Sequence, residues 1–194
     1  KNEQIHQQMR QLKAQHDAVE RAILSIERYR KSPATGTLSL EYIDRRFSWG
    51  IPCSSNFYSD GIHSYESVLR ELRRQLEDRG FAQIHSYNIG TTIAQEDFAA
   101  GRFLAKDIFI FLSRREEGGL TAGQTVESGM YACVYLDNYD DEISCAKELR
   151  EYCLRNNYQI SGDYICEVMT GFHVLDNDPR SMFLRLQVPV TFQK

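Results

Sequence analysis

The chain has 194 residues, 42% of them hydrophobic and 11% aromatic, which is enough for one sizeable folded domain. No apolar run approaches the roughly 20 residues of a membrane span, and no signal-peptide core is present, so we expect a cytoplasmic protein with no membrane contact. The formal net charge is −4. Residues 1–32 carry seven basic and four acidic residues, which leaves 16 basic and 23 acidic residues in the remainder. Such an acidic domain is a poor nucleic-acid surface, and it suits a cationic ligand better.

Residues 1–32 carry a heptad pattern that predicts a coiled-coil helix. Its apolar stripe combines two series, each with a spacing of seven residues: Ile5, Leu12, Val19 and Ile26, and Met9, His16, Ile23 and Arg30. Such a stripe is the seam of a two-stranded coiled coil, so we expect a homodimer through this helix. An antiparallel pair is favoured, because a parallel pair would place His16 and Arg30 against their own copies. No initiator Met or helix cap precedes Lys1, so we expect a longer protein with a further domain upstream.

The helix is expected to end at Ser32–Pro33, and a second domain to occupy residues 38–192. Its expected elements are a strand over 38–49 with a bulge, a helix over 64–79, strands over 84–93 and 103–113, a Gly-rich turn over 117–123, a strand over 130–136, a helix over 140–156, and strands over 160–173 and 182–191. The order strand, helix, strand, strand occurs twice. The sequence therefore predicts an α+β fold, in which two similar halves share an antiparallel sheet with both helices on one side. A groove between such halves is a natural ligand site.

The cysteines and glycines give no sign of a cofactor. Five cysteines occur without a CxxC pair, and the five histidines do not cluster with them at zinc-ligand spacing. We therefore expect free buried thiols, no metal site and no cofactor. The Gly-rich turn lacks the GK[ST] ending of a phosphate-binding loop.

Glu167 is the residue of the second domain with the most informative surroundings. It lies in the segment YICEVMTGF, and Ile165 and Met169 share its face at strand spacing. An unpaired buried carboxylate costs several kcal/mol or takes up a proton. Glu167 is therefore either a ligand-binding carboxylate, a solvent-facing residue on an open sheet, or the ion-pair partner of Arg185 on the neighbouring strand.

Three sequence features show a resemblance to a known family. They are the Gly-x-Tyr-Ala-Cys strand at 129–133, the Ser-Tyr pairs at 64–65 and 86–87, and the acidic strand residue Glu167. With these features, most of residues 38–192 resembles the effector domain of MerR-family multidrug-responsive regulators of the BmrR type, which belongs to the GyrI-like superfamily. The N-terminal helix resembles the long dimerisation helix that joins this domain to a winged-helix DNA-binding domain.

The resemblance implies a pocket that receives lipophilic, cationic drug-like molecules, with Glu167 as its carboxylate. Tyr65 and Tyr87 match pocket aromatics and Met169 matches an aliphatic wall, and aromatic faces add about 0.5 to 2 kcal/mol of cation–π attraction each. The further candidates for the pocket wall are Tyr131, Tyr139, Ile165, Trp49 and Phe57. For Trp49, Phe57 and Tyr131, plain core packing is an equal or better interpretation.

The sequence also departs from the family pattern. A second acidic pocket residue falls near Arg180 here, a neighbouring aromatic falls at Met182, and the loop over 52–61 is longer. The ligand set is therefore expected to differ from that of the family, and neutral or zwitterionic ligands stay open.

The resemblance implies a transcriptional regulator rather than an enzyme. In this interpretation the chain forms a dimer, binds promoter DNA through a domain upstream of Lys1, and acts there on RNA polymerase. Two alternatives stay open. The first is a GyrI-like small-molecule hydrolase, with Glu167 as general base and a Tyr as proton donor. The second is a module that binds and sequesters another protein.

Overall fold

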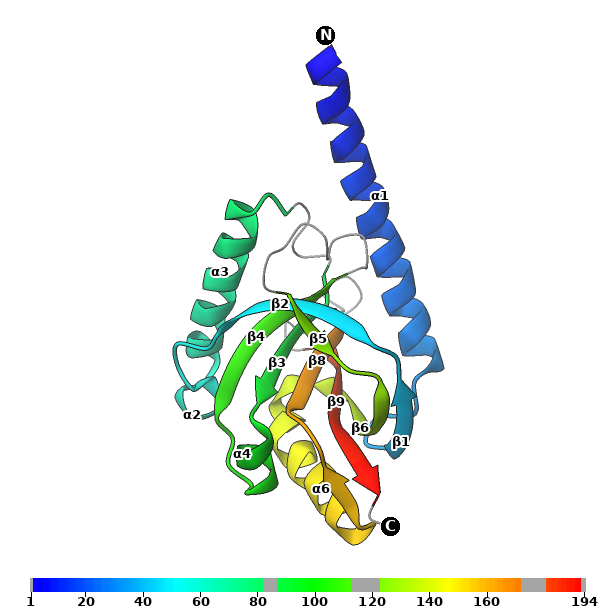
Figure 1. Ribbon diagram of the computed structural model, residues 1–194, viewed down its shortest axis with the longest axis vertical. Helices are drawn as coiled ribbons and strands as arrows, with labels where there is room; N and C mark the ends of the chain where they lie inside the picture. Colours follow the sequence, from blue (N-terminus) through cyan, green and yellow to red (C-terminus); the bar gives the residue numbers. More distant parts are fainter. Residues whose placement is uncertain (1, 82–86, 113–122, 172–180, 193–194) are drawn as a thin grey trace.

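The computed structural model describes residues 2–81, 87–112, 123–171 and 181–192. In chain order the elements are α1 (Asn2–Lys31), β1 (Leu38–Ile43), β2 (Arg46–Pro52), α2 (Phe57–Asp60), α3 (Ile62–Asp78), β3 (Ile89–Ile93), α4 (Gln95–Ala99), β4 (Ala105–Leu112), β5 (Gln124–Val126), β6 (Gly129–Asn138), the 3₁₀ turn η2 (Tyr139–Asp141), α6 (Glu142–Arg155), β7 (Tyr158–Ile160), β8 (Tyr164–Gly171) and β9 (Ser181–Phe192). Helix α1 projects as an arm from a domain built on one curled sheet (Figure 1).

The sheet confirms the expected α+β fold with two similar halves. Its strand order is β1-β6-β9-β8-β3-β4-β2-β5, with β7 paired to β9, and the pairings among the described strands are antiparallel. The first half is β2, α3, β3 and β4, and the second half is β6, α6, β8 and β9. The halves meet where β3 pairs with β8, and the order of strands on either side of this pair is the same.

The expected single strand over 38–49 is wrong in detail, because the structure has two strands there. β1 pairs with β6 at one end of the sheet, whereas β2 pairs with β4 and β5 at the other end. Only Asp44 and Arg45 join the two strands, so their facing ends lie at most about 11 Å apart. The sheet must therefore curl until its two ends approach each other, and β2 arches across the molecule towards β1 (Figure 1).

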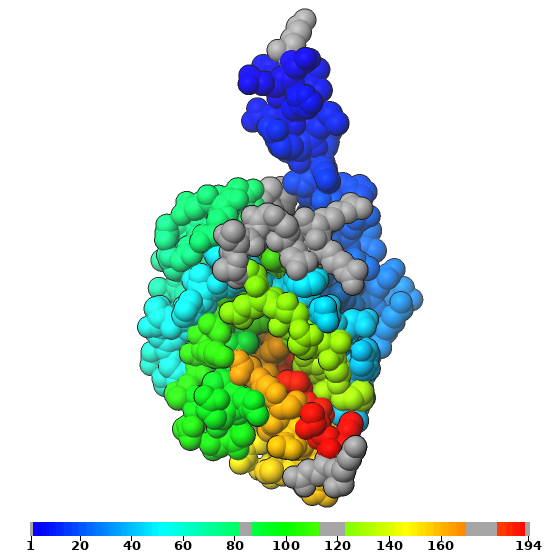
Figure 2. Space-filling view, in the orientation of Figure 1, coloured from blue at the N-terminus to red at the C-terminus, as the bar shows by residue number. Residues whose placement is uncertain are grey.

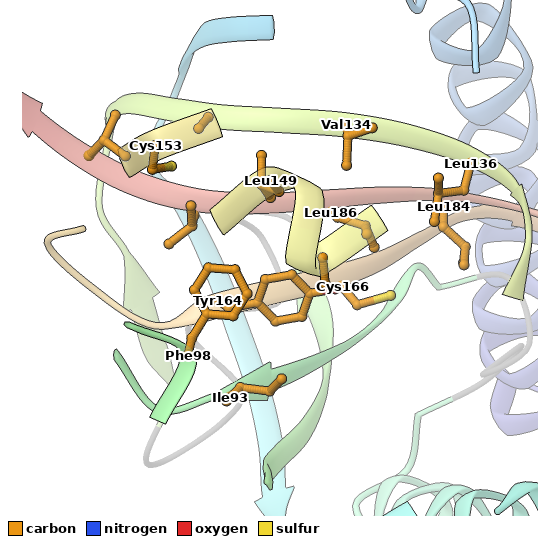
Figure 3. Packing of buried hydrophobic residues seen from close by; sticks show 14 residues of the cluster. Ile93, Phe98, Val134, Leu136, Leu149, Cys153, Tyr164, Cys166, Leu184 and Leu186 are labelled. Atoms are coloured by element: carbon orange, nitrogen blue, oxygen red, sulfur yellow. The ribbon is translucent and has the colours of Figure 1, made fainter. Parts of the chain in front are cut away.

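Helices α3 and α6 pack on the same face of the sheet, as expected. Val68, Leu72 and Leu76 of α3 pack against the side chains of β2 and β4. The inner face of α6 packs against β6, β8 and β9 in a larger cluster, in which the rings of Phe98 and Tyr164 stack with centroids 4.7 Å apart (Figure 3).

Strand pairing shows that these two clusters lie on one side of the sheet. Thr91 of β3 lies directly opposite Ile108, which belongs to the α3 cluster, and directly opposite Cys166, which belongs to the α6 cluster. Directly opposed residues of antiparallel strands have side chains on the same face.

Other boundaries differ from the sequence prediction. The expected strand over 160–173 is divided into β7 and β8, and the short helices α2 and α4 were not expected. Residues 84–86, 113, 117–122, 172–173 and Arg180, which were expected in strands, in the Gly-rich turn or at a pocket position, lie outside the described residues. All five cysteines are free; Cys133, Cys153 and Cys166 are buried, whereas Cys53 and Cys145 are partly exposed.

Helix α1 has two stripes with different surroundings. Ile5, Leu12, Val19 and Ile26 of the heptad stripe are 52–65% exposed, and no residue of the helix is buried. The contacts with the domain come from Arg21, Ser25, Arg28 and Tyr29. These positions lie about 160° around the helix from the heptad stripe, so the two stripes face nearly opposite directions. Among the described helices, none combines the length and apolar sequence needed to cross a bilayer.

We expect Leu72→Ala to lower the free energy of unfolding by about 2–5 kcal/mol, because Leu72 is fully buried between α3 and the sheet. The measurement is a urea denaturation curve followed by circular dichroism. Leu154→Ala is the matched control, since Leu154 of α6 is 54% exposed and its truncation is expected to change the unfolding free energy by at most about 0.5 kcal/mol. Equal effects of the two substitutions would contradict this packing.

Candidate functional site

The site lies on the concave face of the sheet, opposite the helices. Because alternate strand residues point to opposite faces, Ile165 and Glu167 of β8 lie on this face while Cys166 packs against α6. Asp107 and Phe109 of β4 lie on the concave face by the same alternation. The concave face therefore carries the carboxylates Asp107 and Glu167.

A cleft of about 490 Å³ opens on this face. Figure 2 shows the hollow, with β8 and β9 (orange and red) on its floor and the β5–β6 segment (yellow-green) along one rim. Its wall includes apolar and aromatic side chains together with three carboxylates: Phe109, Val126, Met130, Tyr131, Ile165, Pro189 and Val190, and Asp107, Glu127 and Asp163. A volume of this size and a mixed apolar and polar wall are typical of small-molecule sites.

Two glycines shape the floor of the cleft. The ring of Phe109 lies over Gly90 of β3, where an added Cβ would come within 2.3 Å of the ring atom Cζ. At Gly50 of β2, an added Cβ would meet the carbonyl oxygen of Ile108 at 2.4 Å. Only glycine leaves room for these close approaches, so Gly90 lets the Phe109 ring lie over β3 and Gly50 lets β2 approach the backbone of β4.

Asp107 is the carboxylate of the cleft for which the described residues provide no ion pair. Asp163 is paired with Lys106 at 2.6 Å, and Glu127 is paired with Arg45 at 3.3 Å. Asp107 instead accepts a hydrogen bond from the Thr92 hydroxyl at 3.4 Å. Burial raises the pKa of Asp107, and Lys106 offsets only part of this effect. A cation in the cleft would stabilise the ionised form.

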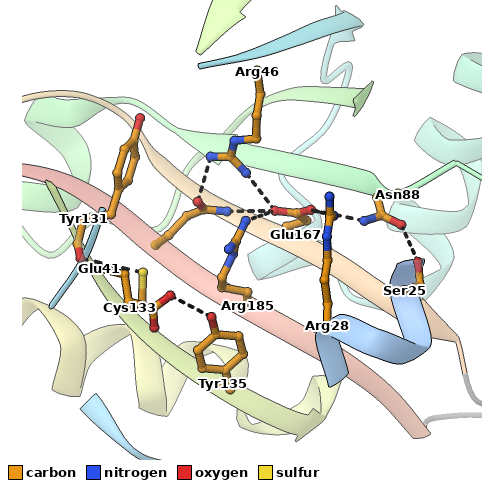
Figure 4. Close-up of polar contacts among 11 residues, drawn as sticks. Ser25, Arg28, Glu41, Arg46, Asn88, Tyr131, Cys133, Tyr135, Glu167 and Arg185 are labelled. Carbon is orange, nitrogen blue, oxygen red and sulfur yellow. Dashed lines mark hydrogen bonds and ion pairs between the residues drawn. The ribbon is translucent and has the colours of Figure 1, made fainter. Parts of the chain in front are cut away.

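Glu167 lies beyond the cleft on the same face, inside a cluster of cationic and amide side chains (Figure 4). Its Oε2 accepts hydrogen bonds from Arg46 at 2.9 Å, Arg185 at 2.7 Å and Gln187 at 3.1 Å. Its Oε1 accepts one from Asn88 at 3.2 Å. The ion pair with Arg185 that the sequence left open is therefore confirmed.

The charge of Glu167 is fully matched by its surroundings. Burial by itself raises the pKa of Glu167, but Arg185 and Arg46 outweigh burial and lower it to about 2. Arg46 and Arg185 are mostly buried as well, with side chains 17% and 12% exposed. The cluster is a buried ion network, in which the loss of one member leaves another charge uncompensated.

The structure does not bring the sequence-predicted pocket residues into one cavity. Ile165 and Tyr131 line the cleft, and Glu167 and Met169 follow Ile165 along the concave face of β8. Tyr65, Tyr139, Phe57 and Trp49 lie on the opposite, helix-bearing face. A single pocket that unites Glu167 with Tyr65 is therefore a wrong expectation, because the sheet separates them.

The residues on the helix-bearing face have packing partners. The Tyr65 ring lies 5.3 Å from that of Phe57 and 5.8 Å from that of Tyr139, and the guanidinium of Arg79 lies 4.4 Å from the Trp49 ring. Trp49 and Phe57 belong to the buried core, as their alternative interpretation held. Tyr87 is also buried, beside Phe81 and under Arg21 of α1, and Ser86 lies outside the described residues.

A second buried carboxylate, Glu142, lies on the helix-bearing face at the start of α6. It accepts hydrogen bonds from the hydroxyls of Tyr58 at 2.8 Å and Tyr164 at 3.1 Å. Burial raises the pKa of Glu142, and the two tyrosine hydrogen bonds only partly oppose this. Its hydrogen bonds tie α2 and β8 to α6, so its evident role is to hold the core together.

Sequence reasoning missed several residues of the concave face: Arg46, Asn88, Asp107, Phe109, Gln187 and, on α1, Arg28. The alternation of β4 was a usable signal. Ile108 and Ile110 pack in the α3 cluster, so Asp107 and Phe109, which alternate with them, share the opposite face of the strand. No local signal links Arg46 to Glu167, since 121 positions separate them.

Comparisons with known proteins show the fold. No protein-family model matches the chain, and no curated protein matches it in sequence. A cryo-EM structure of an EcmrR–DNA complex in EcmrR-RPo matches 99% of this chain and 70% of that chain, at 13% identity and a TM-score of 0.58. The crystal structure of the EcmrR C-terminal domain matches 81% of this chain and 98% of that one, at 13% identity and a TM-score of 0.56.

A third similar structure is an uncharacterized conserved protein from Listeria innocua. It matches 86% of this chain and 98% of that chain, at 9% identity and a TM-score of 0.50. The chain therefore has the α+β fold of the EcmrR C-terminal domain, preceded by a long helix that the match to the larger EcmrR structure also covers.

We expect Glu167→Gln to remove part of the acid sensitivity of the protein. The folded-state pKa of about 2 lies below the ordinary value of about 4.3 for Glu, so the stabilisation is complete above the ordinary value and is lost as the pH falls towards 2. The wild-type urea midpoint should fall steeply between about pH 5 and pH 2, and part of this fall should be missing in the variant. At pH 7 we expect the variant to be about 3 kcal/mol less stable, because two arginines lose their counter-charge.

Glu71→Gln is the matched control for this prediction. Arg74 lowers the pKa of Glu71 to about 2 as well, but this pair is exposed on α3. Exposed pairs contribute little to stability, so the control should keep the wild-type midpoint and its pH dependence. If both variants behave alike, burial does not set the strength of the Glu167 network.

Proposed function

We propose that the chain is the ligand-sensing part of a dimeric MerR-type transcriptional regulator, and that the concave cleft binds lipophilic, cationic, drug-like molecules. The single observation that carries this proposal is a cleft of about 490 Å³ that combines aromatic walls with the half-buried carboxylate Asp107. The fold shared with EcmrR, which has been seen in complex with DNA, supports the regulator class. In this proposal a domain upstream of Lys1 binds promoter DNA in the cytoplasm and acts on RNA polymerase.

Within the cleft, Asp107 is a better counter-charge for a cation than Glu167. The carboxylate of Glu167 already accepts hydrogen bonds from two arginines, so a ligand cation would have to displace a guanidinium from it. Asp107 has no such partner among the described residues, and Phe109 and Tyr131 offer aromatic faces in the same cleft. Cation–π attraction and an unmatched carboxylate favour a delocalised cation without demanding one ligand shape.

We expect tetraphenylphosphonium to bind the chain, and Asp107→Asn to weaken this binding about tenfold, or about 1.4 kcal/mol. The measurement is isothermal titration calorimetry at fixed ionic strength. Glu148→Gln is the control, because Glu148 is an exposed carboxylate on α6, on the other side of the sheet. Both variants remove one negative charge, so a difference between them isolates the cleft.

Glu167→Gln distinguishes this proposal from the original interpretation of Glu167. If Glu167 receives the cation, the Glu167 variant loses affinity and Asp107→Asn keeps it. Neutral or zwitterionic ligands would give binding that neither substitution weakens.

We further propose that the cleft binds its ligand without turnover. Among the described residues, no histidine lines the cleft, and His6, His16 and His63 lie on exposed helix surfaces. The hydrolase alternative requires turnover of an activated ester such as p-nitrophenyl acetate, and turnover that is lost in Asp107→Asn would favour it. The alternative of a protein-sequestering module gains no specific support from the geometry.

Dimerisation through α1 is the other part of the proposal. The heptad stripe is exposed along the whole arm and points away from the domain contacts, so it is free to pair with a second copy. We expect Ile23→Asp to convert the dimer to a monomer in sedimentation velocity. Gln7→Asp adds the same charge on the side of the helix opposite the heptad stripe, and it should remain dimeric.

A further inference from the structure

The arm α1 contacts the domain mainly through polar and aromatic side chains. The Ser25 hydroxyl donates a hydrogen bond to Asn88 at 3.4 Å, and the guanidinium of Arg28 lies 3.9 Å from Glu167. The Tyr29 ring packs edge-on against Phe183, with centroids 4.7 Å apart. A crevice of about 560 Å³ remains between this end of α1 and the sheet. The arm is therefore docked at a few points rather than packed against the domain.

Glu167 connects these docking points to the sheet through its two oxygens. On the arm side, Oε1 faces Arg28 and accepts a hydrogen bond from Asn88, which itself accepts one from Ser25 (Figure 4). On the sheet side, Oε2 accepts hydrogen bonds from Arg46 and Arg185. One buried carboxylate thus serves as the counter-charge for the arm and for β2 at the same time.

Arg46 carries this connection to the wall of the cleft. It comes from the first residue of β2, and its guanidinium lies 4.5 Å from the Phe111 ring centroid and 6.0 Å from that of Tyr131. Tyr131 lines the cleft. Arg46 also donates a hydrogen bond to Gln187 at 2.8 Å, so its position depends on several groups of the concave face. Among the contacts of the described residues, Arg46 is linked to α1 through Glu167, the carboxylate that it shares with Arg28.

We propose that Glu167 is a shared counter-charge that couples the docking of α1 to the position of Arg46 at the cleft wall. The positive charges compete for one carboxylate. When Arg46 moves away, Arg28 gains a stronger partner and loses a like charge nearby, so the arm docks more tightly. When Arg28 moves away, the carboxylate is left to Arg46 and Arg185. In this role Glu167 and Arg46 are positioning residues, and neither needs to touch a ligand.

The geometry makes the arm responsive to such a change. The Arg28 side chain is 53% exposed, and no residue of α1 is buried, so little apolar area opposes release of the arm. The coupling is a property of the protein without ligand, and its test is therefore independent of the proposed function. Its use in sensing rests on the proposed function, because a ligand that displaces the Tyr131 ring or Arg46 would change the docking of the arm.

The test is hydrogen exchange measured by mass spectrometry on the ligand-free chain. Arg28→Gln should raise exchange in residues 22–31 about three- to fivefold, the range expected for loss of a partly exposed ion pair. By reciprocity of the coupling, the same substitution should slow exchange in residues 46–51 of β2. Arg28 is exposed, so this variant is expected to fold.

Arg46→Gln gives the reciprocal measurement, with slower exchange expected in residues 22–31. Arg46→Lys keeps the charge and should restore exchange to near the wild-type rate. Arg45→Gln is the matched control, because Arg45 is the exposed neighbour that pairs with Glu127, and it should leave the arm unchanged. Unchanged or faster exchange in β2 of Arg28→Gln overturns the proposal, because the arm would then be held independently of Arg46. Unchanged or faster exchange of the arm in a folded Arg46→Gln variant overturns it as well.

Discussion

The curl of the sheet is the constraint on which the rest of this structure depends. Two residues join strands that pair at opposite ends of one sheet, so the sheet must close on itself far enough for those strands to meet. Closure gives the sheet a convex face, which α3 and α6 cover, and a concave face with its own interior. The cleft, the buried ion network and the arm contacts of Arg28 and Tyr29 lie on that concave face.

A concave face of this kind buries polar groups that a flat sheet would leave in water. Gln187 and Glu167 are almost fully buried there, and each is hydrogen-bonded to arginine. The cost of removing the charges of Glu167, Arg46 and Arg185 from water is offset only while the network is complete. The same enclosure acts differently on Asp107, since Lys106, the neighbouring cation, is paired with Asp163 and only partly offsets the effect of burial on the pKa of Asp107. Two acidic residues on one face therefore have different chemistry because their neighbours differ.

The arm α1 divides its surface between the domain and solvent. One stripe of α1 docks on the concave face through a few polar and aromatic contacts, and the opposite stripe presents exposed heptad residues. In the proposed dimer, a helix with this division would transmit a change in domain contacts to the second copy as a shift or rotation of the whole element. The shared carboxylate of Glu167 places the beginning of that path beside the cleft, where Arg46 contacts the aromatic rings of the wall.

Local sequence determined the elements of this protein, and only the tertiary structure decided its site. The heptad stripe, the apolar faces of α3 and α6, and the alternation of β9 are local periodicities, so the α+β fold and the two halves could be predicted from them. The break between β1 and β2 was not predictable, because it depends on pairing partners about 55 to 96 positions away. The face on which a residue lies was decided in the same way: Tyr65 and Glu167 were grouped by resemblance, yet the sheet separates them. Glu167 itself was singled out from the sequence, and its ion pair with Arg185, one of three interpretations left open, is confirmed. Its partners Arg46 and Arg28 come from elements that only folding brings together, and charge compensation depends on those distances rather than on neighbouring letters.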